Sequence, residues 1–253
     1  MQWTHDFTST LNGKKVLVTG GSRGIGAAAA RRLAREGADV AVTYVHGKEA
    51  AEEVVRAVEA HGQRAVALRA DAADAQEAAG AVHRAAEALG GLDVLVNNAA
   101  LGLMQPLEDM SLDDVDRLIA VNIRGVFLAS QAAAALMAPG GRIITVGSCI
   151  TARVPGPGAT LYAMSKSAVV GLTKALAREL SGRGITAHVV HPGPIDTDMN
   201  PADGPSASGQ AAMTALGRYG TAEEVASAIA YLARPEAMYM TGTELSVDGG
   251  YAA

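Results

Sequence analysis

Short apolar runs rich in β-branched residues alternate with alanine-rich helical patterns along almost the whole chain. Such runs, bounded by turn residues, are typical of strands that are buried on both faces. The runs lie at 15–19, 40–44, 65–69, 94–97, 142–146, 186–191 and 243–247, and the helical patterns at 27–36, 48–61, 74–89, 112–137, 163–181 and 222–233. Strands separated by helices predict an α/β fold with one doubly wound parallel sheet and helices on both faces. Ligands of such sheets bind at the carboxyl ends of the strands.

The 253 residues show no internal repeat and no linker long enough to divide them, so we expect a single domain over 1–253. Residues 1–12 are expected to form a flexible N-terminal extension. They lack a basic region followed by an apolar run and therefore do not form a signal peptide. The region 200–210, rich in Pro, Gly, Ser and Ala, follows a strand end. It could be an ordinary surface loop, but its position favours a substrate lid over 199–216.

Composition excludes several classes of function. The net charge is −5 and no basic block stands out, which argues against a nucleic-acid partner. The longest uncharged apolar stretch, 125–141, is shorter than the roughly 18 residues of a membrane span and is interpreted as a buried helix. Cys149 is the only cysteine, which excludes an intramolecular disulfide and fits a reducing, cytoplasmic location. The six histidines lack metal-ligand spacing, so no catalytic metal is expected.

A glycine-rich turn, residues 19–26, follows the first predicted strand and opens the first helix. Its spacing is Gly-x-x-x-Gly-x-Gly, formed by Gly20, Gly24 and Gly26, which is neither the longer dinucleotide-binding pattern nor a Walker loop. Glycine lets the backbone turn sharply and approach a ligand closely. Because the N-terminus of a helix offers free N–H groups and a positive dipole end, this turn predicts a pyrophosphate site.

Tyr162 and Lys166 are four residues apart in a helical pattern, so their side chains can share one helix face. A free tyrosine titrates too high to exchange protons efficiently at neutral pH, and a nearby ammonium would lower that pKa. The pair therefore predicts a general acid/base, Tyr162, for reduction of a carbonyl or oxidation of an alcohol. Ser148 follows a strand directly and has no Gly-x-Ser-x-Gly context, so a hydrogen-bond donor to the carbonyl suits it better than a hydrolase nucleophile.

These segments together resemble the motifs of the short-chain dehydrogenase/reductase family: 19–26, 97–100, Ser148, Tyr162-x-x-x-Lys166 and 192–195. The resemblance runs from residue 14 to the end and implies a Rossmann-like fold with hydride transfer. Asn-Asn-Ala-Ala at 97–100 departs mildly from the commoner Asn-Asn-Ala-Gly. The resemblance implies that Ser148 orients the carbonyl, that Lys166 also binds the nicotinamide ribose and that Asn122 holds a proton-relay water. It implies cofactor contacts at Gly20, Ser22, Arg23, Ile25, Gly26, Tyr44, Asp71, Asn98, Tyr162, Lys166, Pro192, Gly193, Ile195 and Thr197.

The second strand indicates which nicotinamide cofactor is used. It ends at Tyr44, and no carboxylate follows until Glu49, whereas an acidic residue there would hold the ribose diol of NAD(H). Arg23 in the glycine turn could be a solvated loop cation, but its guanidinium also suits a 2′-phosphate. Together these features favour NADP(H) over NAD(H). Asp71 resembles the aspartate beside the adenine, although it could equally cap the following helix.

Several alternatives remain open at this stage. Cys149 could be a reactive thiol but is better interpreted as buried or pocket-lining, and His191 as structural. The segments 192–198 and 200–205 resemble a bacterial subgroup that includes cyclic-di-GMP-binding biofilm-dispersal proteins. A cyclic-dinucleotide-binding regulatory protein on the same fold is therefore the alternative function, which the complete Ser–Tyr–Lys set disfavours. The substrate is open among 3-oxoacyl, polyketide and general ketones, and the resemblance implies a homotetramer.

Overall fold

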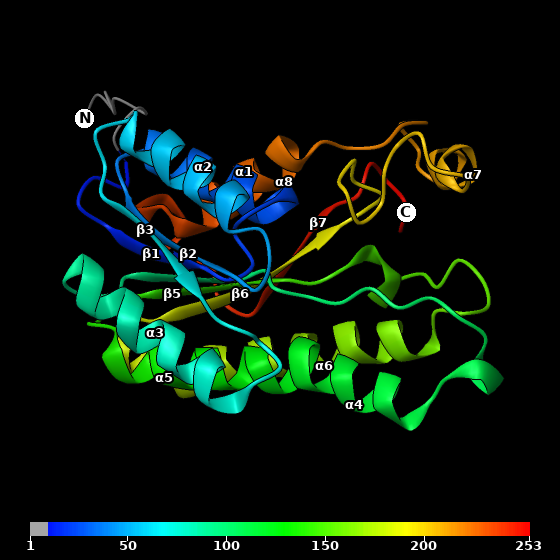
Figure 1. Ribbon diagram of the computed structural model, residues 1–253, viewed down its shortest axis with the longest axis horizontal. Coiled ribbons are helices and arrows are strands. Elements are labelled where there is room, and N and C mark those ends of the chain that lie inside the picture. The colour runs from blue at the N-terminus through cyan, green and yellow to red at the C-terminus, as the bar shows by residue number, and fades with distance from the viewer. Residues whose placement is uncertain (1–9) are drawn as a thin grey trace.

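The computed structural model describes residues 10–253, which form one seven-stranded sheet (Figure 1). The strands are β1 (Lys15–Val18), β2 (Asp39–Tyr44), β3 (Ala65–Arg69), β4 (Val94–Asn97), β5 (Arg142–Val146), β6 (Thr186–Pro192) and β7 (Thr243–Val247). They pair in parallel in the order β3-β2-β1-β4-β5-β6-β7. The strand order reverses between β1 and β4, where doubly wound sheets bind their ligands. The fold class expected from the alternating pattern is confirmed.

Helices cover both faces of the sheet (Figure 1). One face carries α1 (Gly24–Arg35), α2 (Lys48–Glu59) and α8 (Ala222–Ala233), and the other carries α3 (Ala75–Leu89), α4 (Leu112–Ile119), α5 (Val126–Leu136) and α6 (Thr160–Glu179). The short helix α7 (Ala207–Ala212) lies away from the sheet, beyond the carboxyl end of β6. Short 3₁₀ turns occur at Leu107–Asp109, Cys149–Thr151, Ser181–Arg183 and Pro235–Ala237.

Alternate residues of each strand enter two separate cores. Val16 and Val18 of β1 pack with α1 and α8, whereas Leu17 between them packs on the α3 and α5 side with Leu95 and Ile143. All five side chains are buried. Because burial of one such side chain stabilises the fold by about 1.5–3 kcal/mol, these central strands form a rigid support for the loops at their carboxyl ends.

Two helices differ from their expected bounds in ways that matter for the site. Helix α1 begins at Gly24, three residues earlier than expected, so its first turn lies inside the glycine-rich segment. The helix expected over 112–137 consists of α4, a π-helical segment Ala120–Gly125 and α5. A Cβ on Gly125 would lie 2.4 Å from the main-chain oxygen of Ala72, so this close approach requires glycine. π-Helical turns inside α-helices are frequent at functional sites.

The continuous helix Leu112–Leu136 is long and apolar enough to cross a membrane by length and composition. Among the described residues it is the one helix that meets this test. However, 56% of its apolar window is buried inside the protein, where α5 packs on α3 and α4 on α6. Core helices of globular proteins pass the same test, so this stretch is weak evidence for a membrane span.

Most of the expected N-terminal extension, 1–12, lies outside the described residues. Within it, Leu11 is fully buried and its N–H donates to the main-chain oxygen of Glu36 (2.9 Å). The Thr10 hydroxyl donates to the carboxylate of Glu36 (3.0 Å). Arg32 and Arg234 also bind this carboxylate, and together these hydrogen bonds hold the pKa of Glu36 below its usual value despite the opposing effect of burial. Thr10 and Leu11 are therefore part of the domain.

Candidate active site

The glycine-rich turn has the backbone geometry that a phosphate site needs. Gly20 and Gly24 have φ values of +62° and +53°, a region that favours glycine. A Cβ on Gly26 would lie 2.5 Å from the side-chain amide nitrogen of Asn98. Within residues 10–253 no side chain caps α1, whose N-cap residue is Arg23, so the first N–H groups of the helix have no side-chain acceptor there. This arrangement can accept an anion at the start of α1.

Asn98 and Thr19 fix the shape of this turn. The amide of Asn98 donates to the main-chain oxygens of Thr19 (3.0 Å) and Gly20 (2.9 Å). The hydroxyl of Thr19 accepts from the N–H groups of Asn98 (3.0 Å) and Ala99 (3.1 Å). The N–H of Gly20 donates to the hydroxyl of Thr43 (2.9 Å). Asn98 thus connects the loop after β4 to the glycine turn. From the sequence only a contact of Asn98 with the cofactor was expected.

The expected cofactor residues on β2 and beyond β3 lie near the same edge. Tyr44 ends β2 and is partly buried, and Arg23 is exposed beside the start of α1. Asp71 accepts from the N–H of Ala73 (2.8 Å). The cap of α3 is instead Asp74, whose carboxylate accepts from the N–H groups of the first turn. The helix-capping alternative for Asp71 is therefore wrong, and its neighbours Ala70 and Ala72 line a small cavity.

The segment after β6 closes the other side of the glycine turn. A Cβ on Gly193 would lie 2.7 Å from the Cα of Asp248, so glycine is required for the approach to the C-terminal turn. Ile195 is buried and forms a bridge with Gly220. The methyl group of Thr197 would lie 3.3 Å from a Cβ on Gly24. The predicted residues at 192–197 and those of the glycine turn thus meet at one edge of the sheet, together with the partly buried Ser22 and Ile25.

Ser148, Tyr162 and Lys166 are brought together from β5 and α6. Ser148 follows β5 and its hydroxyl accepts from the N–H of Ile150 (3.3 Å). Tyr162 lies in the first turn of α6, and the ammonium of Lys166 lies 5.8 Å from the centre of its ring. The ammonium donates to the main-chain oxygen of Val146 (2.9 Å), which lies two residues before Ser148. The three predicted catalytic side chains therefore surround the carboxyl end of β5.

The pKa values at the site differ from the expected direction. Burial raises the pKa of Tyr162 above its usual value, and the hydroxyl of Ser148 only partly opposes this effect. Burial lowers the pKa of Lys166 to about 8, and its side chain is 5% exposed. From the sequence, the ammonium of Lys166 was expected to lower the pKa of Tyr162. In this structure desolvation is the largest influence on the pKa of both groups.

Asn122 lies in the π-helical segment and is buried. Its side-chain oxygen accepts from the N–H of Leu101 (2.8 Å), and its amide donates to the main-chain oxygen of Leu101 (2.9 Å) and to the hydroxyl of Ser165 (3.1 Å). Ser165 in turn donates to the main-chain oxygen of Tyr162 (2.8 Å). Asn122 therefore connects the loop after β4 to the helical turn that carries Tyr162.

Cys149 is a free, buried cysteine directly after Ser148. Burial, with a smaller contribution from the charge of Asp248, raises the pKa of its thiol to about 11. Since the thiolate is the reactive form, this thiol is protonated at neutral pH and is a poor nucleophile. Among residues 10–253, no group of three or more His, Cys, Asp or Glu side chains is arranged to hold a metal ion.

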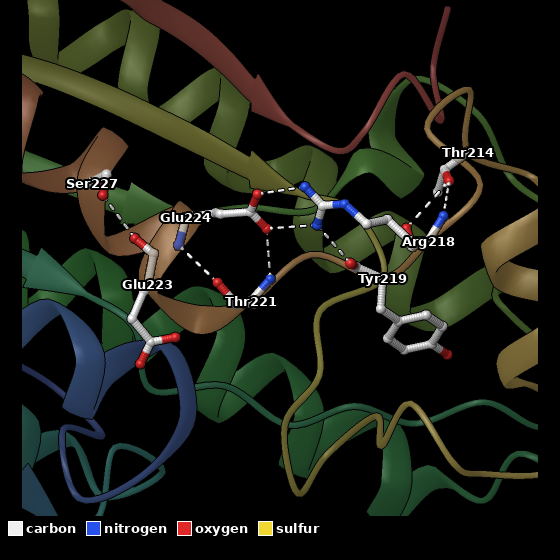
Figure 2. A network of polar contacts seen from close by, with 7 residues as sticks. All are labelled: Thr214, Arg218, Tyr219, Thr221, Glu223, Glu224 and Ser227. Atoms are coloured by element: carbon white, nitrogen blue, oxygen red, sulfur yellow. Dashed lines mark hydrogen bonds and ion pairs between the residues drawn. The ribbon is translucent and has the colours of Figure 1, made fainter.

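A polar network lies at the end of the segment expected to form the lid (Figure 2). The guanidinium of Arg218 binds both carboxylate oxygens of Glu224 (2.7 and 3.0 Å) and the main-chain oxygen of Tyr219 (2.9 Å). The N–H of Thr221 donates to the same carboxylate (2.8 Å), and its hydroxyl accepts from the N–H of Glu224 (3.2 Å). These contacts hold the pKa of Glu224 down at about 2. The network fixes residues 218–221 to the N-terminus of α8.

This network was not predicted from the sequence, although Thr221-x-x-Glu224 is a capping-box pattern that precedes a helix. The roles of Thr19 and Thr43 in holding the glycine turn were not predicted either, and their only signal in the sequence was their position at strand ends. Within the expected lid, the side-chain amides of Asn200 and Gln210 bind each other (2.9 and 3.2 Å).

Comparison with known proteins agrees with this geometry. A family model described as enoyl-(acyl carrier protein) reductase matches residues 20–252. The chain is 53% identical to a short-chain dehydrogenase from Burkholderia cenocepacia J2315, which was solved in complex with NADP. The two structures match with a TM-score of 0.96 over 97% of this chain and 100% of the other. A blue fluorescent protein from a metagenomic library, solved in complex with NADPH, has the same identity and coverage and a TM-score of 0.95.

The cyclic-di-GMP-binding biofilm dispersal mediator protein of Escherichia coli (strain K12) is 44% identical over 243 residues, which is 96% of this chain and 99% of the other. The chain belongs to the short-chain dehydrogenase/reductase family. It is an oxidoreductase of that family with the Rossmann-like parallel sheet, and the resemblance stated from the sequence motifs is confirmed.

Proposed function

We propose that the protein is an NADPH-dependent carbonyl reductase, also able to run the reverse oxidation of a secondary alcohol. The observation that carries the proposal is the convergence of Ser148, Tyr162 and Lys166 at the carboxyl end of β5, beside the glycine turn. NADPH, when bound, supplies the hydride that reduces the carbonyl carbon. The protein's own groups then have to orient the carbonyl and deliver one proton to its oxygen.

Each catalytic side chain has a role that its surroundings support. The hydroxyl of Ser148 donates to the carbonyl oxygen, and the phenol of Tyr162 donates the proton as negative charge develops there. A raised phenol pKa keeps Tyr162 protonated and ready to donate in the reductive direction. Lys166, with a pKa of about 8, is still largely cationic at pH 7 and its charge favours the phenolate that remains.

The residues present fit a dinucleotide phosphate. Glycine at 20, 24 and 26 leaves space that a Cβ would fill, and the start of α1 lacks a capping side chain among the described residues. β2 ends at Tyr44 without a carboxylate to repel a 2′-phosphate, and Arg23 is exposed close by. The NADP and NADPH complexes of the similar structures support the same cofactor here. NADP(H) is therefore the preferred cofactor.

For the supply of protons to Tyr162, Asn122 is the residue that would hold a proton-relay water.

The substrate we propose is a neutral, mainly apolar ketone or aldehyde. Exposed apolar side chains lie on the three segments that follow the strand ends around Tyr162: Met104, Val154, Met199 and Leu216. The sulfur of Met199 would lie 3.4 Å from a Cβ on Gly102, so this lid residue reaches the loop after β4. This contact supports residues 199–216 as a lid that shields the reacting carbonyl from water.

Replacement of the proposed acid tests the function. Tyr162→Phe should lower kcat for a reducible ketone by roughly 100- to 10,000-fold, because the phenylalanine has no proton to donate. NADPH binding, measured by fluorescence titration, should persist in this variant. Cys149→Ala is the matched control at a neighbouring buried position that takes no part in the proton transfer. Unchanged turnover in Tyr162→Phe, or no turnover of any ketone or aldehyde by the wild type, would refute the proposal.

A second candidate function is cyclic-dinucleotide binding, favoured by the similarity to the Escherichia coli dispersal mediator. Titration with cyclic di-GMP in the presence and absence of NADPH tests it. Tight binding without turnover of any carbonyl would favour this regulatory function over the enzyme.

We also propose a homotetramer that works in the cytoplasm. Exposed apolar side chains lie on helices over the two faces of the sheet: Leu112, Phe127, Leu136 and Met164 on α4 to α6, and Tyr231 on α8 with Met238 and Tyr239 shortly after it. Two such surfaces on one protomer suit an assembly with two kinds of interface. The single free, buried cysteine suits a reducing compartment. Light scattering after size-exclusion chromatography would measure the assembly.

A further inference from the structure

His191, near the end of β6, contacts the backbone of the catalytic serine. Its Nδ1 lies 2.9 Å from the main-chain oxygen of Ser148 and 3.2 Å from the main-chain nitrogen of the same residue. The hydroxyl of Thr151 lies 3.3 Å from Nδ1 and donates to the oxygen of Ser148 (3.0 Å). His191 is 3% exposed, so water does not compete for these contacts.

The residue before Ser148 makes room for this ring. A Cβ on Gly147 would lie 2.6 Å from Nδ1 of His191 and 2.8 Å from a methyl group of Val189. Any side chain at position 147 would therefore push the imidazole away from Ser148. The N–H of Gly147 donates to the main-chain oxygen of Val190 (2.7 Å), which holds the turn against β6.

The other edge of the imidazole faces charged groups on β7 and α6. Its Nε2 lies 3.3 Å from the carboxylate of Glu244, and that carboxylate is 2.7 Å from the ammonium of Lys174. Lys174 holds the pKa of Glu244 below its usual value, so the carboxylate is charged at neutral pH. The imidazole and this carboxylate do not have hydrogen-bond geometry, but the negative charge of the carboxylate at this distance favours a proton on Nε2.

Both protonation states of the ring hold Ser148. Neutral His191, with its proton on Nε2, accepts at Nδ1 from the N–H of Ser148, whereas the imidazolium donates at Nδ1 to the main-chain oxygen. In either state one edge of the ring contacts the backbone of Ser148 and the opposite edge lies 3.3 Å from the carboxylate of Glu244.

We infer that His191 is a positioning residue: it fixes the backbone of Ser148, and thereby its hydroxyl, while Glu244 and Lys174 hold the imidazole in place. The inference rests on the proposed carbonyl reduction, in which Ser148 contacts the substrate. A small displacement of a catalytic group can cost about 100-fold in rate, so loss of this support should lower kcat more than it changes cofactor binding.

Substitution of His191 by Asn or by Gln tests the contacts of the two edges of the ring separately. His191→Asn places an amide near the position of Nδ1, whereas His191→Gln places it near Nε2, and His191→Leu provides neither. We expect kcat to fall about 10- to 100-fold in the Gln and Leu variants and to be largely rescued in the Asn variant. The Kd for NADPH should stay within about twofold in all three, because the polar contacts of the imidazole are with Ser148, Thr151 and Glu244 and not with the glycine turn. Equal losses in the Asn and Leu variants, or no loss in any variant, would overturn the inference.

A second variant tests the support from β7. Glu244→Ala should lower kcat severalfold with His191 in place and should have no further effect in the His191→Asn background, since the group it holds is then absent. Glu52→Ala, which breaks the surface pair of Glu52 with Lys48 (3.4 Å), is the matched control. Equal effects of Glu244→Ala in the two backgrounds would exclude Glu244 from the positioning role.

Hydrogen exchange keeps this inference separate from the proposed function. Amides of residues 147–153 should exchange faster in the Gln and Leu variants than in the wild type and the Asn variant, whether or not a ketone is turned over. Absence of wild-type turnover would therefore refute the carbonyl reductase alone, whereas uniform exchange across the variants would refute the positioning by His191.

Discussion

The guanidinium of Arg23 lies 3.7 Å from the carboxylate of Asp198, linking the glycine turn to the segment that leads into the proposed lid. The two side chains are 70% and 72% exposed, so solvent screens the pair and its contribution is below about 1 kcal/mol. A phosphate offers Arg23 stronger, bidentate charge-assisted hydrogen bonds. The proposed 2′-phosphate can therefore displace Asp198 at little cost.

Replacement of Arg23 should change the preference between the two nicotinamide cofactors. Arg23→Ala is expected to raise the KM for NADPH about tenfold and the KM for NADH less than twofold, because only NADPH carries the 2′-phosphate. Asp198→Asn should lower the KM for NADPH roughly twofold, since it removes a competing carboxylate. Steady-state kinetics with both cofactors measures these effects. An equal rise for both cofactors in Arg23→Ala would show that Arg23 does not bind the 2′-phosphate.

Most of the fold could be predicted from the sequence, because the signals for strands, helices and turns are local. The apolar runs of the seven strands and the glycines at 20, 24 and 26 follow from chain periodicity and from backbone conformations that need glycine. Tyr162 and Lys166 could be paired from their four-residue spacing alone. The roles of Asn98 and His191 could not, because each depends on a contact across strands that only the register of the sheet brings together.

The pKa values of the site could not be predicted from spacing either. The sequence shows that Lys166 is close to Tyr162, but it does not show that both groups are buried deeply enough for desolvation to dominate. In the same way, nothing in the apolar pattern over 112–137 marks the π-helical turn, at the end of which Gly125 closely approaches Ala72.

The lowered pKa of Lys166 should appear in the pH dependence of stability. The unfolded chain, in which lysine has its usual pKa near 10.4, binds more protons than the folded protein between about pH 8 and 10.5. The penalty for burying the charged amine is therefore complete below pH 8 and is relieved as the pH rises through this range.

We expect the free energy of unfolding of the wild type, relative to Lys166→Met, to increase by up to about 3 kcal/mol between pH 7.5 and 10.5. Urea unfolding of the protein without cofactor at several pH values measures the difference. Lys174→Met is the control, because that lysine is 58% exposed on the same helix. A constant difference across the range would contradict a lowered pKa for Lys166.

Asn122 should be important for stability as well as for catalysis. Asn122→Ala removes the partners of both the N–H and the carbonyl of Leu101 and should cost about 1–3 kcal/mol, because these partly buried groups would lose their hydrogen bonds. Asn122→Asp keeps the acceptor for the N–H and should lie between the alanine variant and the wild type. Urea unfolding gives the order of the three proteins. Equal stability of the alanine variant and the wild type would mean that water replaces the side chain without cost.

Glu224 and Glu223 offer a matched pair for the network at the end of the proposed lid (Figure 2). Glu224 binds Arg218 and the N–H of Thr221, whereas the carboxylate of Glu223 makes no hydrogen bond or ion pair within residues 10–253. Glu224→Gln should lower the free energy of unfolding by about 1 kcal/mol, a value that allows for solvent screening of these exposed groups, and Glu223→Gln should lower it by less than half as much.

The effect of Glu224→Gln should also depend on pH. The folded protein lowers the pKa of this carboxyl to about 2, so its contribution is complete above the usual value of 4.5 and disappears as the pH falls from 4.5 toward 2. Thermal unfolding of the two variants and the wild type between pH 3 and 7 measures this convergence. Because residues 218–221 anchor the lid to α8, Glu224→Gln should also raise the KM for the ketone more than it lowers kcat. A Tm difference that stays constant down to pH 3 would show that the charge of Glu224 does not stabilise this network.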